Sequence, residues 1–224
     1  MKANPSKFQG FSITRNHDDV SLILSGVEIP VTKTIKLLGL YIDNKLKFDD
    51  HVSKLCRKAA FHVNAISRIS KYLDTKSLLK LFHAFVRSNF QYSNFVWHFT
   101  DNVSIIKMEK LHRRAICIVL NDYNSSYKDI LTKAKVDSLY ISRIKSIAIE
   151  AFKCHNKINP TFLHDLIVAK ESEYDFRDPY KAKIPQKSTS GYGLGSFSFE
   201  APKIWNSLPV DIKSSSTLEI LFIE

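Results

Sequence analysis

The sequence lacks any long apolar run, and it has little cysteine. No stretch approaches the roughly 18 consecutive apolar residues that a membrane-spanning helix needs. The opening residues, MKANPSKF, contain no apolar segment of the kind that a secretory signal has. The three cysteines, Cys56, Cys117 and Cys154, are far apart and odd in number, which argues against a disulfide framework and against a zinc site. We therefore expect an intracellular protein of the cytoplasm, the nucleus or both, with reduced core thiols and no membrane partner.

Motifs of several common catalytic chemistries are also missing. The eight histidines are scattered, and no His-x3-His, H-E-x-x-H or Cys-x2-Cys spacing occurs. Neither the nucleophile motif G-x-S-x-G nor the phosphate-binding motif G-x-x-x-x-G-K-[ST] is present. Gly191, Gly193 and Gly195 follow a loop pattern rather than a strand, which is a poor context for a phosphate-binding loop. The residues themselves therefore offer no catalytic and no metal-ligating candidate.

Positive charge is abundant and unevenly distributed. The 224 residues carry a net charge of +11. Residues 1–43 have five Lys/Arg and four Asp/Glu, residues 44–123 have fourteen and six, and residues 124–224 have fourteen and twelve. A basic middle region favours a polyanionic partner, with nucleic acid first. The alternative is a basic surface that is merely solvated.

The apolar pattern predicts a mainly helical α+β fold. We expect strands over 8–13 and 35–42 and a hairpin of 20–24 with 27–29, joined into one small antiparallel sheet of three or four strands. Gly39 is expected to mark a bulge in the strand 35–42 or a close approach of another backbone segment. A helical bundle follows, and the C-terminal segment is expected to be extended, with the aromatic residues of 197–209 docking it onto the helices.

Apolar residues at helical spacing set the helix boundaries. The predicted helices span 49–72, 74–99, 103–120 and 139–158, with short helical turns at 127–134 and 160–168. Asp49 or Asp50 is expected to cap the first helix.

Basic side chains lie away from the apolar stripes of the helices 49–72 and 103–120. The nucleic-acid-binding candidates are Lys54, Arg57, Lys58, Arg68, Lys107, Lys110, Arg113 and Arg114. Phe61 falls among the basic residues of the first helix, where it stacks on a base or sugar or, the interpretation we favour, packs against another part of the protein.

Several stretches resemble one known family. The segment TIKLLGLYIDNKLKFDDH, residues 34–51, resembles the end of the palm and the start of the thumb in reverse transcriptases of LINE-type (non-LTR) retrotransposons, the jockey-like group especially. The stretches NPSK near the start, LCRKAAFHVNAISRISKYL, LHRRAICIVLNDYNSSYKDIL and APKIWNSLPVDIK look like further parts of the same proteins. Together the resemblance covers nearly all of the chain.

The resemblance implies a division into four regions. These are a palm remnant at 1–47, a thumb-like helical bundle at 48–123, further helices packed on the bundle at 124–170 and an extended or irregular C-terminal segment at 171–224. By the same match, Lys7 lies near the incoming nucleotide. Leu37, Leu38 and Gly39 belong to the primer grip.

The match leaves out the catalytic machinery of the family, an RNA-directed DNA polymerase. Its two metal ions are held by carboxylates of upstream palm motifs, one of the form [YF]-x-D-D. The pairs Asp18-Asp19 and Asp49-Asp50 lack that context and are better interpreted as turns or helix starts. The fingers and the endonuclease domain are also missing, and Met1 corresponds to an internal position of the family pattern, as in a truncated element or a partial gene model.

We therefore expect a fragment that is not an enzyme by itself and has no cofactor of its own, Mg²⁺ belonging only to the full-length parent. Its residual role would be binding of an RNA/DNA primer-template without reading sequence. Its other partners would be the missing palm, fingers and endonuclease of the parent polyprotein. Two alternatives are a basic helical protein-interaction module and a non-functional truncated relic.

Overall fold

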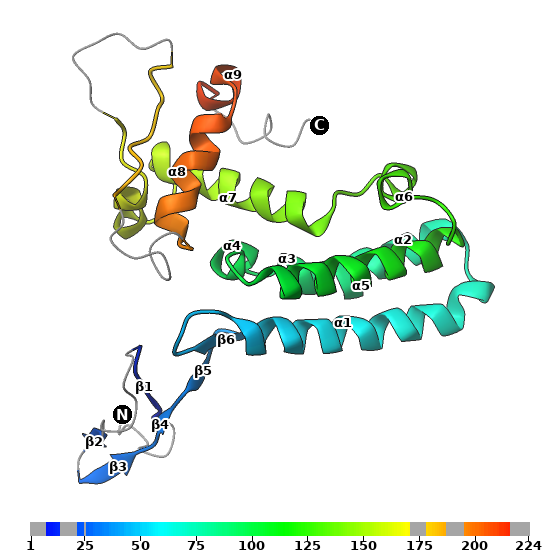
Figure 1. Cartoon of the computed structure of the whole chain (residues 1–224), viewed down its shortest axis with the longest axis horizontal. Coiled ribbons are helices and arrows are strands. Elements are labelled where there is room, and N and C mark those ends of the chain that lie inside the picture. The colour runs from blue at the N-terminus through cyan, green and yellow to red at the C-terminus, as the bar shows by residue number, and fades with distance from the viewer. Residues whose placement is uncertain (1–7, 14–21, 25, 171–177, 187–194, 216–224) are drawn as a thin grey trace. The chain divides into compact units, whose positions relative to one another are not determined.

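A computed structural model of the chain describes residues 8–13, 22–24, 26–170, 178–186 and 195–215. Figure 1 shows a mainly helical protein with short strands in its N-terminal region, as the sequence predicts. The strands are β1 (Gly10–Phe11), β2 (Leu22–Leu24), β3 (Val27–Ile29), β4 (Val31–Thr32), β5 (Thr34–Leu37) and β6 (Leu40–Asp43). The helices are α1 (Asp49–Ile69), η2 (Ser70–Tyr72), α2 (Thr75–Leu81), η3 (Phe82–Arg87), α3 (Ser88–Gln91), α4 (Asn94–Trp97), α5 (Asn102–Leu120), α6 (Tyr127–Ala134), α7 (Leu139–His155), η4 (Thr161–Leu166), α8 (Phe197–Ser207) and α9 (Val210–Lys213).

The chain forms two compact units. The first unit comprises Met1–Asn89 and Thr100–Tyr123, and the second comprises Phe90–Phe99 and Asn124–Glu224. The chain thus leaves the first unit for ten residues, which include α4, and then returns to it with α5. The first unit holds nineteen Lys/Arg against ten Asp/Glu, whereas the second holds fourteen against twelve.

The strands of the first unit pair two by two. The hairpin β2–β3 is antiparallel, as predicted, and β5 and β6 form a second antiparallel hairpin where one strand was expected. β1 pairs with β4 in parallel, and among the described residues the three ladders do not join into the single sheet that we expected. Pro30 separates β3 from β4 and has no N–H to continue a ladder. Its carbonyl instead accepts a hydrogen bond from the Gly10 N–H at 3.0 Å. A Cβ atom at Gly10 would come within 2.5 Å of the end of the Leu22 side chain, which would have to move to admit it.

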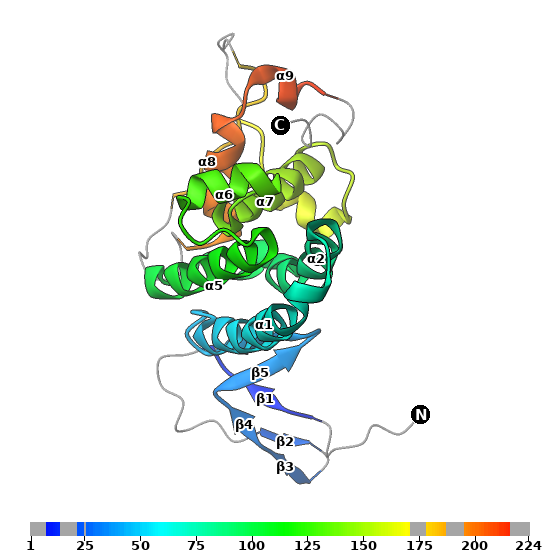
Figure 2. The same cartoon turned by 90° about the vertical axis from the view of Figure 1, so that its right-hand side faces the viewer.

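The helices α1 and α5 pack side by side in the first unit, and both views show them together (Figures 1 and 2). Their buried faces, with Ala59 and Val63 on α1 and Met108 on α5, meet Phe82 and Val86 of η3. The predicted helices 49–72 and 103–120 are confirmed.

The predicted helix 74–99 is wrong as a single helix. A π-helical turn, η3, interrupts its regular hydrogen bonding, and Ser93 ends it with a left-handed backbone (φ 46°). The elements α2, η3 and α3 therefore follow one another without a gap from Thr75 to Gln91, whereas α4 is separate and belongs to the second unit.

The second unit is built around α7 and α8. Phe152 of α7 and Trp205 of α8 are fully buried, with 6.3 Å between their ring centroids. The predicted helical turns at 127–134 and 160–168 appear as α6 and η4. The prediction of extended chain is wrong for 197–207 and 210–213, which form α8 and α9. Phe197, Ala201 and Trp205 recur every four residues and face the core. Pro202 lies inside this helix, and a proline in that place argues against a helix when the sequence alone is considered.

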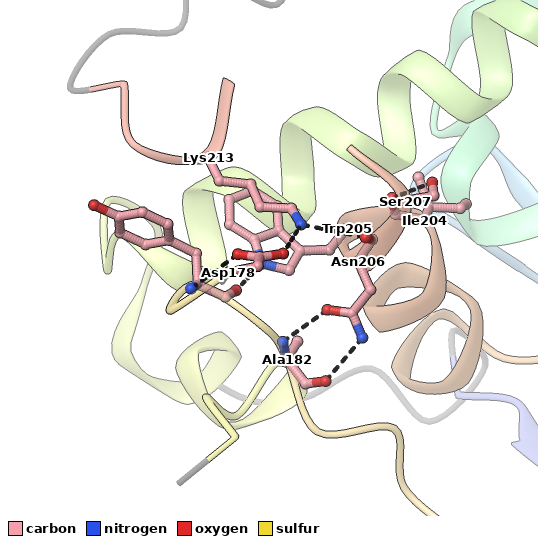
Figure 3. Close-up of polar contacts among 8 residues, drawn as sticks. Asp178, Ala182, Ile204, Trp205, Asn206, Ser207 and Lys213 are labelled. Atoms are coloured by element: carbon pink, nitrogen blue, oxygen red, sulfur yellow. Dashed lines mark hydrogen bonds and ion pairs between the residues drawn. The ribbon is translucent and has the colours of Figure 1, made fainter. Parts of the chain in front are cut away.

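The end of α8 and the helix α9 hold residues 178–182, which contain a turn at Pro179-Tyr180, in what we call the 178–182 clamp (Figure 3). Trp205 Nε1 donates a hydrogen bond to the Tyr180 carbonyl at 2.7 Å. The amide of Asn206 binds both main-chain groups of Ala182, at 2.8 and 2.9 Å. Lys213 Nζ lies 2.6 Å from Asp178 Oδ2, and the Lys213 side chain is wholly buried. The predicted docking of this region by aromatic residues is thus confirmed for Trp205.

All three cysteines are free and buried, as predicted. Cys56 and Cys117 belong to the first unit and Cys154 to the second. Asn159 donates a hydrogen bond to Cys154 Sγ at 3.0 Å, and burial raises the pKa of this thiol. A buried thiol with a raised pKa is protonated at neutral pH and is a poor nucleophile, so Cys154 serves packing.

Candidate nucleic-acid interface

A groove runs between α1 and α5 of the first unit. Its volume is about 340 Å³, and its lining residues are Cys56, Arg57, Ala60, Lys107, Lys110, Leu111 and Arg114. The α5 residues recur at intervals of three and four, which places them on one helix face. Asp49 at the start of α1 lies near Asp101 at the start of α5, and Asn64 further along α1 meets Arg114 further along α5. The two helices therefore run in the same direction.

The groove has an apolar floor and a cationic rim. Cys56 is only 3% exposed, and burial raises the pKa of its thiol although the charge of Lys107 opposes this. Ala60 and Leu111 complete the apolar lining, while the four lining Lys and Arg residues are all exposed. A cationic rim on exposed helices attracts phosphate oxygens, and it carries no base-reading geometry.

Asn64 of α1 orients two of the cations, Arg68 of α1 and Arg114 of α5. Arg114 Nη2 donates a hydrogen bond to the Asn64 side-chain oxygen at 3.0 Å. Arg68 Nε donates to the main-chain oxygen of the same residue at 3.4 Å. Asn64 is neutral, so both guanidinium charges remain uncompensated by this contact and available to an anion.

The structure places four of the eight predicted cations in the lining of the groove and the other four outside it. Arg57, Lys107, Lys110 and Arg114 line the groove. Lys54 is placed differently, with its Nζ 3.3 Å from the ring centroid of Tyr41, a cation–π contact that ties α1 to β6. Arg68, Lys58 and Arg113 are exposed but do not line the groove.

The residues matched to the primer grip form the tip of a hairpin. Leu37 pairs with Leu40, so Leu38 and Gly39 are a two-residue turn, and the predicted continuous strand with a bulge is wrong. Both turn residues have left-handed backbones, with φ of 46° at Leu38 and 88° at Gly39. This is the geometry that a tight hairpin requires, and leucine adopts it only at a cost. Leu38 is 83% exposed.

Asp43 is an organising residue whose role the sequence only hinted at. One of its carboxylate oxygens accepts hydrogen bonds from the N–H groups of Lys45 and Lys47, at 3.0 and 3.1 Å, and the other accepts from Phe48 at 2.5 Å. These bonds turn the chain from β6 into α1 and so fix where the groove begins. Its place after a strand, in the pair Asp43-Asn44, was the available signal.

The predicted helix cap at Asp49 or Asp50 is wrong. Phe48 takes the N-cap position with φ of 61°, and no side chain caps the helix there. Asp49 and Asp50 lie in the first turn, where negative charge favours the positive end of the helix. Burial raises the pKa of Asp49, and repulsion from Asp101 and Asp43 adds to this rise.

Other candidates carry no site in the described part of the chain. Lys7 and the pair Asp18-Asp19 lie outside the described residues. Among the residues that the structure describes, no group of three or more His, Cys, Asp or Glu could hold a metal ion. Within the same ranges, no helix is long and apolar enough to cross a bilayer.

Comparisons with known proteins add no assignment. A scan of family models, a search of curated proteins and a search of solved structures found no match to this chain.

Proposed function

We propose that the chain is the C-terminal part of a LINE-type, jockey-like reverse transcriptase, spanning the end of the palm, the thumb and the C-terminal region. In this proposal the α1–α5 groove binds phosphates of an RNA/DNA primer-template without reading its sequence. The observation that carries the binding role is the convergence of Arg57, Lys107, Lys110 and Arg114 on one groove. The resemblance of residues 34–51 and of the further stretches supports the family.

The proposed role is binding and not catalysis. The carboxylates that would hold Mg²⁺ belong to the palm of the full-length parent, and polymerisation belongs to that parent. The hairpin tip at Leu37–Gly39 would lie near the primer end. The protein would act inside the cell, in the cytoplasm or nucleus, beside the palm, fingers and endonuclease of the parent polyprotein.

A salt titration tests the binding role. Neutralisation of four phosphates gives a slope of log affinity against log salt of about −3 to −4. We expect this slope for the 224-residue chain on a short RNA–DNA heteroduplex, measured by fluorescence anisotropy. A flat salt response contradicts the proposal. Equal affinity for heparin of matched charge favours instead a basic surface that serves protein interaction or nothing specific.

A charge-matched pair of variants locates the binding. Lys107→Gln with Lys110→Gln removes two charges from the groove, whereas Lys128→Gln with Lys183→Gln removes two exposed charges from the second unit. We expect the groove variant to reduce the salt slope by about 2, since each lost phosphate contact removes nearly one unit. The second-unit variant should leave the slope unchanged, and equal effects of the two variants would show that only total charge matters.

A further inference from the structure

A series of aromatic rings runs from the outward face of α1, where Phe61 lies on the same stripe as the groove residue Arg57, across to η3. Phe61 of α1 is 64% exposed and Phe85 of η3 is 48% exposed. The ring of His62 joins them, with its centroid 5.6 Å from Phe61 and 5.5 Å from Phe85. We call these three residues the aromatic row. The packing of Phe61 against another part of the protein, which the sequence favoured, does not occur, because most of its surface is exposed.

The aromatic row lies in a region of one charge sign. Between Asp50 and Asp74 the chain contains no acidic residue, but it contains Lys54, Arg57, Lys58, Arg68 and Lys71. At 100° per residue, Phe61 falls on the same outward stripe of α1 as Arg57 and Arg68. Ala60, its immediate neighbour, lines the groove. An anionic chain held by the groove cations therefore passes within reach of Phe61.

We propose that Phe61, at the outward end of the aromatic row, stacks on an unpaired base of a single-stranded stretch of nucleic acid whose phosphates lie along the α1–α5 groove. This inference rests on the proposed function and narrows its ligand from a duplex to a strand with accessible bases. Bases in a duplex already stack on one another, so their faces are closed to Phe61. Base–aromatic stacking tolerates any sequence, because every base has a π-face.

The charge argues against a protein as the occupant of this surface. Exposed apolar rings alone suit a protein partner as well as a base. Here the rings are flanked by cations, with no acidic residue over more than five turns of α1 and η2, and a polyanion neutralises this surface along its whole length. The planes of Phe61 and His62 are inclined at 74°, so these two rings are not stacked on each other.

Two substitutions at one position separate stacking from packing. Phe61→Leu keeps an apolar side chain and removes the ring, and Phe61→Tyr keeps the ring. Affinities of the full chain are measured by anisotropy for a 12-nucleotide single-stranded RNA, for an abasic strand of the same length and charge, and for a heteroduplex. We expect Phe61→Leu to weaken binding of the single strand about tenfold. It should change binding of the abasic strand and the heteroduplex less than twofold, and Phe61→Tyr should match the unchanged chain.

The outcomes distinguish this inference from the function on which it rests. If the chain binds all three ligands with the expected salt slope and Phe61→Leu changes none of them, the stacking inference fails and the phosphate groove stands. If no ligand shows salt-dependent binding, both fail. Equal losses on the abasic and the intact strand also overturn stacking. If Phe61→Leu instead abolishes self-association in sedimentation while RNA binding is unchanged, the aromatic row contacts a second copy, and the inference is wrong.

Discussion

Lys213 in the second unit and Lys110 in the first show two opposite uses of the same side chain. Lys213 is wholly buried and paired with Asp178 at 2.6 Å, so its charge is neutralised within the 178–182 clamp. Lys110 is exposed on a groove whose other charged lining residues are all cations. The first unit as a whole has nine more basic than acidic residues, and the second has two more. A paired and buried charge maintains a fold, whereas clustered and exposed cations are available to a ligand.

Among the variants that test this contrast, Lys213→Met is expected to have the largest effect, a loss of unfolding free energy in the second unit. Methionine fills a similar volume but leaves Asp178 without its buried partner, and breaking such a pair costs about 3 kcal/mol of unfolding free energy. Both tryptophans, Trp97 and Trp205, belong to the second unit, so tryptophan fluorescence during urea unfolding reports on that unit alone. Lys203→Met is the control, because Lys203 lies on the exposed side of α8, and it should cost less than about 0.5 kcal/mol. Equal losses from the two variants would contradict a structural role for the clamp pair.

Acid should destabilise the second unit through a histidine. Burial, with the charge of Arg143, lowers the pKa of His98 to about 4. The neutral imidazole is therefore favoured in the folded state, and its contribution is complete above about pH 6.5 and is lost as the pH falls toward 4. His98→Phe keeps a ring beside Tyr140 and removes the proton.

The measurement is urea unfolding at pH 7, 6 and 5, followed by tryptophan fluorescence. His98→Phe should flatten the fall of unfolding free energy by up to about 1.4 kcal/mol per pH unit. Burial also lowers the pKa of His155, 4.8 Å from the Trp205 ring, so part of the slope should remain. An unchanged slope in His98→Phe would contradict the assignment.

Loss of the carboxylate of Asp43 should loosen the start of α1 in the first unit. Asp43→Ala removes an acceptor shared by three main-chain N–H groups, which we expect to cost about 1 to 2 kcal/mol. Asp43→Asn keeps one acceptor oxygen and should cost less. Hydrogen exchange of the amides of residues 45–48 measures the change directly. Exchange that is as slow in Asp43→Ala as in the unchanged chain would show that the Asp43 carboxylate does not stabilise the turn.

The sequence predicted the parts of this fold that depend on local periodicity. The helices 49–72 and 103–120 follow from apolar stripes that are long and regular, and both are confirmed. The turn at Leu38-Gly39 was missed because leucine disfavours a left-handed backbone, and α8 was missed because Pro202 lies inside it. In each case a residue is held in a conformation that local preference opposes.

The sequence predicted which basic residues belong to the two helices, but not which of them would come together in the groove. All eight basic candidates lie on the two helices that form the groove, yet only four of them line it. Whether a cation lines the groove depends on which flank of α1 packs against α5. This packing is a long-range contact, and helical spacing within one segment does not predict it. Lys54 illustrates this, because its contact with Tyr41 depends on the turn that Asp43 directs.

The smallest expected effect on stability belongs to the groove itself. Lys107→Gln with Lys110→Gln should change the unfolding free energy by less than about 0.5 kcal/mol, because exposed lysines contribute little to a fold. If clustered cations repel one another across the groove, the double variant should even be slightly more stable at low salt, and this gain should vanish as added salt screens the repulsion. Circular dichroism during urea unfolding, at about 20 and 500 mM salt, measures the change in unfolding free energy and its dependence on salt. A loss of stability comparable to that of Lys213→Met would mean that the groove lysines are structural, and the distinction between the two units would then disappear.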